Sequence, residues 1–474
     1  MATRPISTIF LKLTVGFLTV AAIAYPGRLS AQPALLEQLR ALPGTEVFES
    51  DAQAPLQRDF EILVAQPFDH NHPEAGGFVQ RVFLSHVNPR RPMVVVTEGY
   101  QIDGPSRYEL TGILDANQLR IEHRFNGGST PDSIPWQYLT VEQAAADHHH
   151  IINMFRKLYP GKWVSTGISK GGQTALFHRY FYPEDVHATV AYVSPMPTSL
   201  EDPRLNDFIA SRGTPDCREK IRNFQRAVLH NREGLRPLIR QWATEQHERF
   251  PLGVDSTLEY AVLEYPFSFW QSTAGECDRI PPAQSSPEIL FEELSRVVPL
   301  SLYSENGIAG YRASFYQFFT QLGYYGFATD HLGDLLEKLP HPDNAVFAPP
   351  EALGKYDSTL VLNVLDWLQT RGDNILYIYG GQDSWSGAAV ELIPGQTNAL
   401  KMVCEGGWHA TRIHSFPPSG QFRIYDALQE WLDMPVGPRR DPFAWAMVAV
   451  VSLFLLSMLL GILWLIVRKR PDRG

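Results

Sequence analysis

The chain has little of what marks several common classes of protein. Only three of its 474 residues are cysteine, too few for a small fold held together by disulfides. It also lacks a basic stripe and a glycine-rich loop that cradles phosphate, and its net charge is -10. We therefore expect no nucleic-acid partner. No repeat or low-complexity tract stands out, and the length suits a large core or a catalytic domain with an insertion.

The three cysteines are expected to differ in their roles. Cys217 and Cys277 could pair in an oxidising compartment, although connectivity cannot be proved from sequence. Cys404 lies in an apolar, strand-like run, which predicts a buried thiol.

The N-terminus has the layout of a secretory signal peptide over residues 1–31. Arg4 and Lys12 are followed by the apolar run LTVGFLTVAAIAY and then by small residues. Cleavage could follow Ala24 or Ala31. An uncleaved anchor helix is the alternative, but the apolar run is shorter than the roughly 20 residues that a bilayer crossing needs.

A second apolar stretch, over 443–467, predicts a transmembrane helix near the C-terminus. It carries no charge, matches the hydrocarbon core in length and has Trp445 and Trp464 near its edges. A linker over 435–442 precedes it, and the basic tail over 468–474 favours a cytoplasmic C-terminus. With the signal peptide, this predicts an extracytoplasmic domain, periplasmic or on the cell surface, anchored in the membrane by one C-terminal helix.

Short apolar runs alternate with helix-like segments in two parts of the chain. In 32–196 the predicted strands are PMVVVTEGY, QLRIEHRF, KWVSTGIS and VHATVAYVSP, and the helix predicted over 140–159 has Thr140 as its cap. The alternation returns over 349–434 with NILYIYGGQDSW and NALKMVCEGGWHA, and the helix RIYDALQEWL closes the domain. This pattern predicts a parallel sheet with crossover helices.

The pattern changes between these two parts, over 197–348. Helix-like segments such as CREKIRNFQRAVLHNREGLRPLIRQWATE and SFYQFFTQLGYYG occur there with no convincing strand between them. We interpret this stretch as an inserted helical cap domain. The sequence thus predicts an α/β fold whose sheet is formed by two parts of the chain.

The segment STGISKGG predicts a nucleophile on a strained turn between a strand and a helix. Gly167 and Gly171 flank Ser169 at the glycine positions of a G-x-S-x-G elbow, where the backbone packs closely. An ordinary tight turn is the alternative, because such a pattern also occurs by chance. The position of the segment between an apolar run and a helix favours the elbow.

A serine hydroxyl needs a base, and the base needs an orienting carboxylate. Asp383 and His409 each follow an apolar run, in the chain order of serine, acid and histidine that accompanies this elbow. His178 and His414 are other candidate bases, but the first would point away from the site and the second lies past the strand-end loop. The histidine run at 148–150 lacks the spacing of metal ligands, so we expect neither a metal nor another cofactor.

An oxyanion hole needs two backbone N–H groups. One is expected from Lys170, which follows the nucleophile, and the other from the loop near Gly99 and Tyr100. We interpret the side chain of Lys170 as a solvated or salt-bridged charge, so that its amide rather than its ammonium acts in catalysis.

These motifs together resemble those of a known family. STGISKGGQTALFHRYFYPEDVHATVAYVSP is similar to the nucleophile region of bacterial secreted tripeptidyl aminopeptidases, which are serine peptidases with an α/β-hydrolase fold. IEHRFNGGS and WQYLTVEQAAAD resemble stretches of their distant relatives, the prolyl carboxypeptidases and dipeptidyl peptidase II. LEYPFSFWQ, QLGYYGF, GGQDSWSG and GGWHATRI extend the likeness over residues 40–433.

The resemblance implies an α/β-hydrolase sheet with a helical cap, and the roles of nucleophile for Ser169, orienter for Asp383 and base for His409. It also implies peptide substrates, from whose free N-termini short peptides, chiefly tripeptides, are removed with proline tolerated or preferred near the cut. The predicted membrane span departs from a purely secreted family, which leaves release into the medium open.

An exopeptidase of this kind must recognise the α-ammonium of its substrate. A desolvated carboxylate at a fixed distance from the serine would do so, and Glu264, among the aromatic residues of LEYPFSFWQ, is our candidate. The alternative for Glu264 is a surface salt bridge, and Glu305 and Asp330 are rival candidates.

Two other functions compete with this one. An esterase or lipase of the same fold shares every argument about the triad and differs in its cap and in its indifference to a free amine. A surface protein that binds peptides or glycans without catalysis is a rival from another class. The presence of serine, acid and histidine in the right order argues against it.

Overall fold

The computed structural model describes residues 31–52 and 57–437. The chain divides into two units, Met1–Pro43 and Gly44–Gly474. In the first unit, helix α1 covers Ala31–Arg40. The second unit contains every strand of the sheet and all the candidate site residues.

Several predicted segments at the two ends of the chain lie outside the described residues. They are the signal peptide up to residue 30, most of the linker, the transmembrane helix over 443–467 and the basic tail. In the described part of the chain, no helix is both long enough and apolar enough to cross a membrane. The signal peptide and the membrane anchor therefore stay predictions.

Within the described residues, the second unit is built on a nine-stranded sheet with the order β1-β2-β3-β5-β4-β6-β7-β8-β9. The strands are β1 (Thr45–Ser50), β2 (Arg58–Pro67), β3 (Gly77–His86), β4 (Met93–Thr97), β5 (Asn117–Ile121), β6 (Trp163–Ile168), β7 (Ala188–Tyr192), β8 (Ile375–Gly380) and β9 (Leu400–Cys404). The central strands β4, β7 and β8 are buried along their whole length. That burial on both faces explains why they are continuous apolar runs in the sequence.

The sheet is mixed rather than parallel. From β5 through β9 neighbouring strands pair in parallel, whereas β1, β2, β3 and β5 pair antiparallel. The prediction of a parallel sheet is therefore wrong for this edge. The connections between β1, β2 and β3 are too short for a crossover helix, so these strands can pair only as neighbours that reverse direction.

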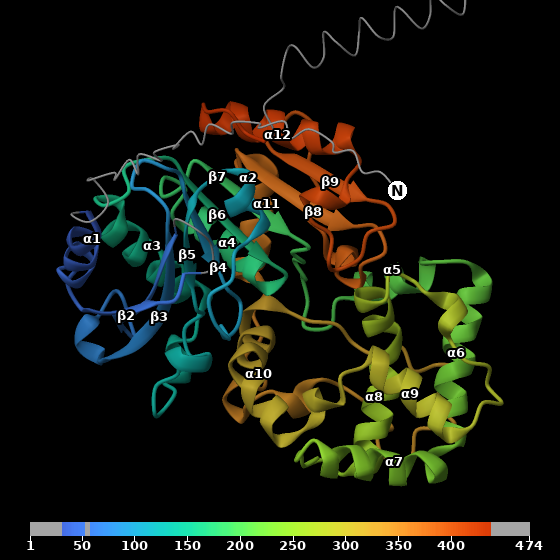
Figure 1. Ribbon diagram of the computed structural model, residues 1–474. Helices are drawn as coiled ribbons and strands as arrows, with labels where there is room; N and C mark the ends of the chain where they lie inside the picture. The colour runs from blue at the N-terminus through green and yellow to red at the C-terminus, as the bar shows by residue number, and fades with distance from the viewer. Residues whose placement is uncertain (1–30, 53–56, 438–474) are drawn as a thin grey trace, which may run out of the picture. The chain divides into compact units, whose positions relative to one another are not determined.

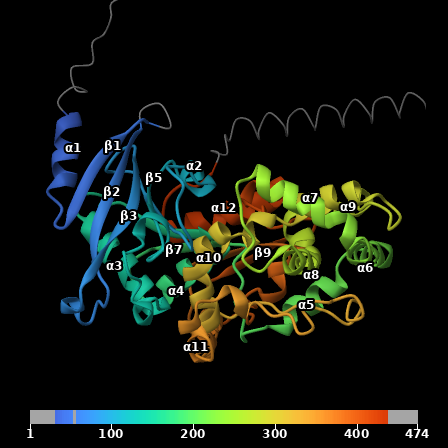
Figure 2. The ribbon, with the colours of Figure 1, turned by 90° about the horizontal axis from the view of Figure 1, so that it is seen from below.

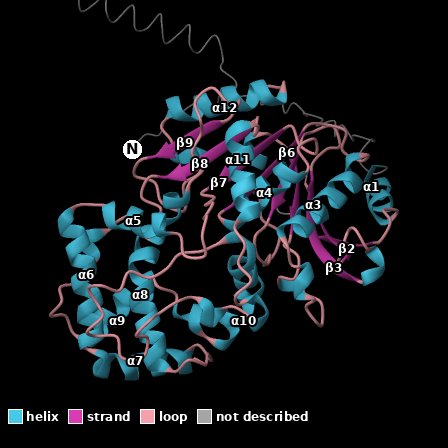
Figure 3. Ribbon diagram, turned by 180° about the vertical axis from the view of Figure 1, so that it is seen from behind, coloured by secondary structure: helices cyan, strands magenta, loops and turns pink. Residues whose placement is uncertain are grey.

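Helices cover both faces of the sheet. Helices α3 (Val141–Arg156), α4 (Lys170–Phe181) and α11 (Thr359–Thr370) pack on one face, and α12 (Pro418–Leu432) packs on the other (Figure 3). Helix α2 (Glu109–Ile113) packs on the same face as α12. Thr140 caps α3, as predicted, because its side chain accepts a hydrogen bond from the backbone N–H of Gln143. These layers form the α/β-hydrolase-like fold that the resemblance implied.

The remaining long helices lie between β7 and β8 in the chain, and we call them the cap helices. They are α5 (Pro203–Ser211), α6 (Pro215–His230), α7 (Arg232–Glu245), α8 (Val254–Ser272), α9 (Pro287–Val297) and α10 (Glu305–Gln317). Helices α6 to α9 pack around a hydrophobic core of their own (Figure 1, Figure 2). Across the described part of this stretch no strand forms, although an isolated bridge pairs Glu201 with Tyr324.

The cysteines follow the prediction only in part. Cys217 on α6 forms a disulfide with Cys277, and their Cα atoms are 5.4 Å apart. The prediction of a buried thiol at Cys404 is wrong, because this residue is half-buried at the end of β9. Strand β9 lies at the edge of the sheet, where only one neighbouring strand covers it.

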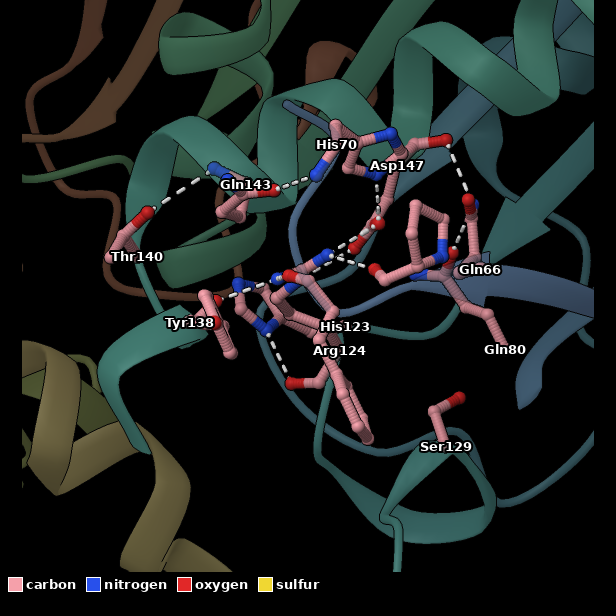
Figure 4. A network of polar contacts seen from close by, with 12 residues as sticks. Gln66, His70, Gln80, His123, Arg124, Ser129, Tyr138, Thr140, Gln143 and Asp147 are labelled. Carbon is pink, nitrogen blue, oxygen red and sulfur yellow. Dashed lines mark hydrogen bonds and ion pairs between the residues drawn. The ribbon is translucent and has the colours of Figure 1, made fainter. Parts of the chain in front are cut away.

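A buried ion pair joins α3 to the segment that follows β5 (Figure 4). Arg124 and Asp147 have fully buried side chains, and the guanidinium donates to the two carboxylate oxygens at 2.6 and 2.7 Å. Arg124 also donates to the backbone oxygen of Tyr138 at 2.6 Å, and His70 Nε2 lies 2.7 Å from Asp147 Oδ1. The motifs IEHRFNGGS and WQYLTVEQAAAD therefore meet in one buried network.

Candidate active site

Ser169 lies on a strained turn between β6 and α4. Its φ of 56° and ψ of -125° place it in a region that residues with a side chain rarely adopt. A Cβ atom at Gly167 would lie 2.1 Å from the backbone oxygen of Gly171, and one at Gly171 would lie 2.7 Å from that of Thr97. The close approach of the backbone therefore requires both glycines of the elbow.

Asp383 and His409 follow β8 and β9 and contact each other. His409 Nδ1 lies 2.8 Å from Asp383 Oδ2, and the carboxylate is fully buried. His409 lines the same cavity as Ser169, although no hydrogen bond between these two residues is present in the described structure. Hydrogen bonds of catalytic groups often tighten only when substrate binds. The structure thus brings the three predicted residues to one site, and their roles stay predictions.

The other candidate bases lie elsewhere. His178 is buried on α4, with Nε2 3.0 Å from Asp185 Oδ2. His414 is exposed, and its Nδ1 lies 2.7 Å from Glu109 Oε1. Neither histidine lines the cavity that contains Ser169. Among residues 31–52 and 57–437, no group of three or more His, Cys, Asp or Glu side chains could hold a metal ion.

The backbone N–H groups of Lys170 and Tyr100 are available for an oxyanion. In the described part of the chain neither donates a hydrogen bond. The loop that carries Tyr100 is held in place by its neighbours: the N–H of His123 donates to the Tyr100 oxygen at 3.3 Å, and the N–H of Ile102 donates to Glu122 Oε1 at 2.8 Å. A hole of this kind works because its donors are fixed before the reaction.

The ammonium of Lys170 is buried, so the prediction of a solvated or salt-bridged side chain is wrong. Nζ donates to the backbone oxygen of Gly99 and to Gln317 Oε1, both at 2.7 Å. Burial lowers the pKa of Lys170 to about 7. Because Gln317 is the last residue of α10, this side chain connects the elbow, the oxyanion loop and the cap helices. The sequence contains no local signal for a contact between residues so far apart in the chain.

A cavity of about 500 Å³ contains Ser169 and His409. Ten of its 21 lining residues are Tyr, Phe or Trp, and much of the wall comes from the stretch between β7 and β8. The aromatic lining residues are Tyr100, Tyr108, Tyr303, Tyr311, Phe315, Phe318, Tyr324, Tyr325, Phe347 and Trp385.

Glu264 lines this cavity from α8 and is only 6% exposed. Its carboxylate accepts hydrogen bonds from Ser268 Oγ at 2.7 Å and from the Tyr325 hydroxyl at 2.6 Å. Burial raises the pKa of Glu264 to about 7, against the lowering effect of these two bonds. No cationic side chain within the described residues pairs with it, so the interpretation as a surface salt bridge is wrong. Its rivals Glu305 and Asp330 are exposed and do not line the cavity.

A further acid in the cavity was missed from the sequence. Glu98 lines the wall and accepts hydrogen bonds from the Tyr108 hydroxyl at 2.8 Å and from Arg120 Nε at 2.5 Å. The available signal was its position directly after the apolar run of β4, since the strand-end argument that selects Asp383 applies equally to Glu98.

Comparison with known proteins decides the family. The model of the PS-10 peptidase S37 family matches residues 32–450. The chain belongs to the PS-10 peptidase S37 family. A relative from Streptomyces mobaraensis, a prolyl tri/tetrapeptidyl aminopeptidase, is 31% identical over 391 residues, which are 81% of this chain and 81% of the relative. The S37 membership and this relative make the chain a serine peptidase.

Two solved structures with a similar chain path are more distant in sequence from this S37 peptidase than the Streptomyces relative. A proline iminopeptidase from Mycobacterium smegmatis is 14% identical, with 78% of this chain and 97% of that chain covered and a TM-score of 0.36. An epoxide hydrolase A from Mycobacterium thermoresistibile is 16% identical, with 77% and 98% covered and a TM-score of 0.32. Likeness at this level supports no inference about activity.

Proposed function

We propose that the chain is an exopeptidase that releases short peptides, chiefly tripeptides, from free N-termini through an acyl-enzyme on Ser169. The observation that carries this proposal is the buried carboxylate of Glu264, which faces the same cavity as Ser169 without a cationic partner in the described structure. A buried charge of this kind is stabilised when an opposite charge enters and pairs with it. The α-ammonium of a peptide is such a charge, and its position would fix how many residues lie before the cut.

Two further observations support this choice of substrate. The relative from Streptomyces mobaraensis is, by its name, a prolyl tri/tetrapeptidyl aminopeptidase. About half of the residues that line the cavity are aromatic, and aromatic rings provide flat apolar surfaces against which a proline ring packs well. Proline near the cut is therefore tolerated or preferred in the proposed reaction.

The proposed mechanism uses the groups that the fold brings together. His409 takes the proton of Ser169 while Asp383 holds the imidazole, and the serine oxygen attacks the peptide carbonyl. The backbone N–H groups of Lys170 and Tyr100 stabilise the oxyanion. His409 then protonates the leaving nitrogen, and water releases the acyl group by the reverse sequence.

The proposal places the enzyme outside the cytoplasm, exported by its signal peptide and held by one C-terminal transmembrane helix. This location rests on the sequence of the two ends of the chain. The disulfide between Cys217 and Cys277 supports it, since disulfides persist in oxidising compartments.

The test is a digestion of a proline-containing peptide with a free N-terminus beside its N-acetylated twin, read by mass spectrometry. The full chain is used, with Ser169→Ala as the control. Stepwise loss of tripeptides from the free peptide alone is the expected result. If neither peptide is cleaved while a fluorophosphonate still labels Ser169, the exopeptidase proposal is wrong and an esterase becomes the better candidate.

A further inference from the structure

A second cavity, of about 310 Å³, adjoins the one that contains Ser169. The two cavities share Tyr108 and Ile168 in their walls, and Ile168 directly precedes the nucleophile. We call the second one the basic cavity. Its other lining residues are Ser106, Arg107, Glu109, Arg120, Tyr192 and Arg412.

Arg412 places a positive charge in the basic cavity close to the catalytic histidine. Its Nη1 donates to the backbone oxygens of His409 and Thr411, at 3.1 and 2.8 Å. The guanidinium has further N–H donors, and no carboxylate forms an ion pair with it in the part of the chain that the structure describes. The side chain is half-buried, and burial lowers the pKa of Arg412.

The other two arginines differ from each other. Arg120 is neutralised, because its Nε lies 2.5 Å from Glu98 Oε1 on the wall of the catalytic cavity. Arg107 is exposed, and within residues 31–52 and 57–437 it has no ion-pair partner. In the described part of the chain, the basic cavity therefore holds two cations, Arg107 and Arg412, that form no ion pair, although Glu109 and Asp383 act on Arg412 from a greater distance.

Glu109, the acid in the lining, is already occupied. Its carboxylate accepts hydrogen bonds from the backbone N–H groups of Ile413 and His414 at 2.9 and 2.8 Å, and from the Tyr192 hydroxyl at 3.3 Å. His414 Nδ1 lies 2.7 Å from the same carboxylate. These bonds leave Glu109 charged, so it offsets part of the positive charge of the cavity, but three arginines line the cavity against this one carboxylate.

We propose that the basic cavity binds a carboxylate of the leaving peptide. The catalytic histidine protonates the leaving nitrogen, so the leaving segment passes His409 and the adjoining Arg412. The carboxylate comes from the C-terminus of a short substrate or from an acidic side chain just beyond the cut. This inference rests on the proposed function for the roles of Ser169 and His409, and it adds a preference for short or acidic leaving segments.

The test compares substrates that share the same tripeptide on the acyl side of the cut and differ in the leaving group. The first leaving group is a dipeptide with a free C-terminus, the second is the same dipeptide as its amide, and the third is an arylamide without any carboxylate. We expect kcat/KM for the acid to exceed that for the amide about tenfold, as one charge-assisted contact gives, and the ratio to fall as salt is added. A fourth leaving group, an amidated dipeptide that contains Asp, distinguishes a C-terminal carboxylate from a side-chain carboxylate. Its kcat/KM should be about tenfold above that of the plain amide only if the cavity also accepts an acidic side chain.

Variants show whether the arginines cause this preference. Arg107→Gln and Arg412→Gln should each lower the acid-to-amide ratio, and together they should bring it close to unity. Because Arg412 also holds the backbone of His409, its replacement can lower kcat/KM for every substrate. A purely structural effect of this kind leaves the acid-to-amide ratio of kcat/KM unchanged. Arg371→Gln is the matched control: this exposed arginine lies between α11 and β8, at the opposite end of the parallel strands from Ser169, and its loss should not change the ratio.

The outcomes separate this inference from the function on which it rests. Equal kcat/KM for acid and amide, with both cleaved, overturns the carboxylate site and leaves the exopeptidase intact. An acid preference that survives the double substitution also overturns it. Failure to cleave any of the substrates overturns the proposed function itself.

Discussion

Replacement of Glu264 by Gln tests the recognition of the substrate N-terminus with little change in shape. The amide has the same size as the carboxylate, and the hydroxyls of Ser268 and Tyr325 can rotate to donate or accept as the amide requires. The substitution therefore removes a charge without leaving a buried polar group unpaired. Two measurable quantities, the stability of the fold and the activity on free N-termini, should then change in opposite directions.

The stability effect follows from the raised pKa of Glu264. A carboxyl whose pKa rises from 4.5 to about 7 on folding binds its proton more tightly in the folded state, so the free energy of unfolding falls as pH rises between these values. At about 1.4 kcal/mol for each pH unit, the difference corresponds to about 3 kcal/mol above the folded pKa. Glu264→Gln removes this penalty, so the variant should melt at a higher temperature than the wild type at about pH 8 and lose that advantage below about pH 5.

The activity effect follows from the loss of a buried charge pair with the α-ammonium. Truncation of one partner of such a pair costs about 2 to 5 kcal/mol, so kcat/KM for a free tripeptidyl arylamide should fall on the order of a hundredfold, mainly through KM. The N-acetylated ester, which has no ammonium, should be hydrolysed at the wild-type rate.

The assay measures kcat/KM of both substrates and the melting temperature of both proteins over a range of pH. Equal losses on the free and the N-blocked substrate would refute the role in N-terminus binding. A variant that melts below the wild type at about pH 8 would refute the argument that the carboxylate is held at a cost.

Three other substitutions have defined outcomes. Ser169→Ala should lower kcat on the order of a millionfold and abolish labelling by a fluorophosphonate, whereas residual labelling elsewhere in the site would identify another nucleophile. In the wild type, the free energy of unfolding should rise between about pH 7 and pH 10.5, because a lysine whose pKa is lowered by burial binds its proton more weakly in the folded state. Lys170→Met should abolish this rise, and denaturant titrations over the same pH range measure it. Asp147→Asn leaves the charge of Arg124 unpaired in the interior and should cost about 3 to 5 kcal/mol, seen as a lower urea midpoint, while an unchanged midpoint would contradict the burial of the pair.

The parts of the site that could be predicted from the sequence are those with a local signal. Ser169 stands between two glycines at a junction of strand and helix. Asp383 follows the buried strand β8 and His409 follows the edge strand β9, and both strands are apolar runs in the sequence. Each of these signals spans a few residues and needs no knowledge of the rest of the chain. The same holds for Thr140 as the cap of α3.

The parts that could not be predicted depend on contacts between distant segments. The burial of Lys170 results from Gln317, which lies far along the chain on a cap helix, so a lysine beside a turn looks solvated in the sequence alone. The other strands could be predicted because apolar runs alternate with helix-like segments in the sequence. No long helix separates β1, β2 and β3, so this pattern does not reveal the antiparallel edge of the sheet. The basic cavity combines residues from five places in the chain, three of them on the strands β5, β6 and β7, and none of its arginines stands in a recognisable motif.

The location of Glu264 on a cap helix, apart from the strand ends that carry the triad, gives this peptidase a modular architecture. Under the proposed function, the strand ends of the sheet supply the residues that break the bond, and Glu264 on α8 sets where the N-terminus of the substrate stops. A change in the seating of α8 would then alter the length of the released fragment while the hydrolytic machinery stays intact. If Glu264 binds the N-terminus as proposed, redesign of the insertion alone should change the fragment length, with the strands and the elbow left unchanged.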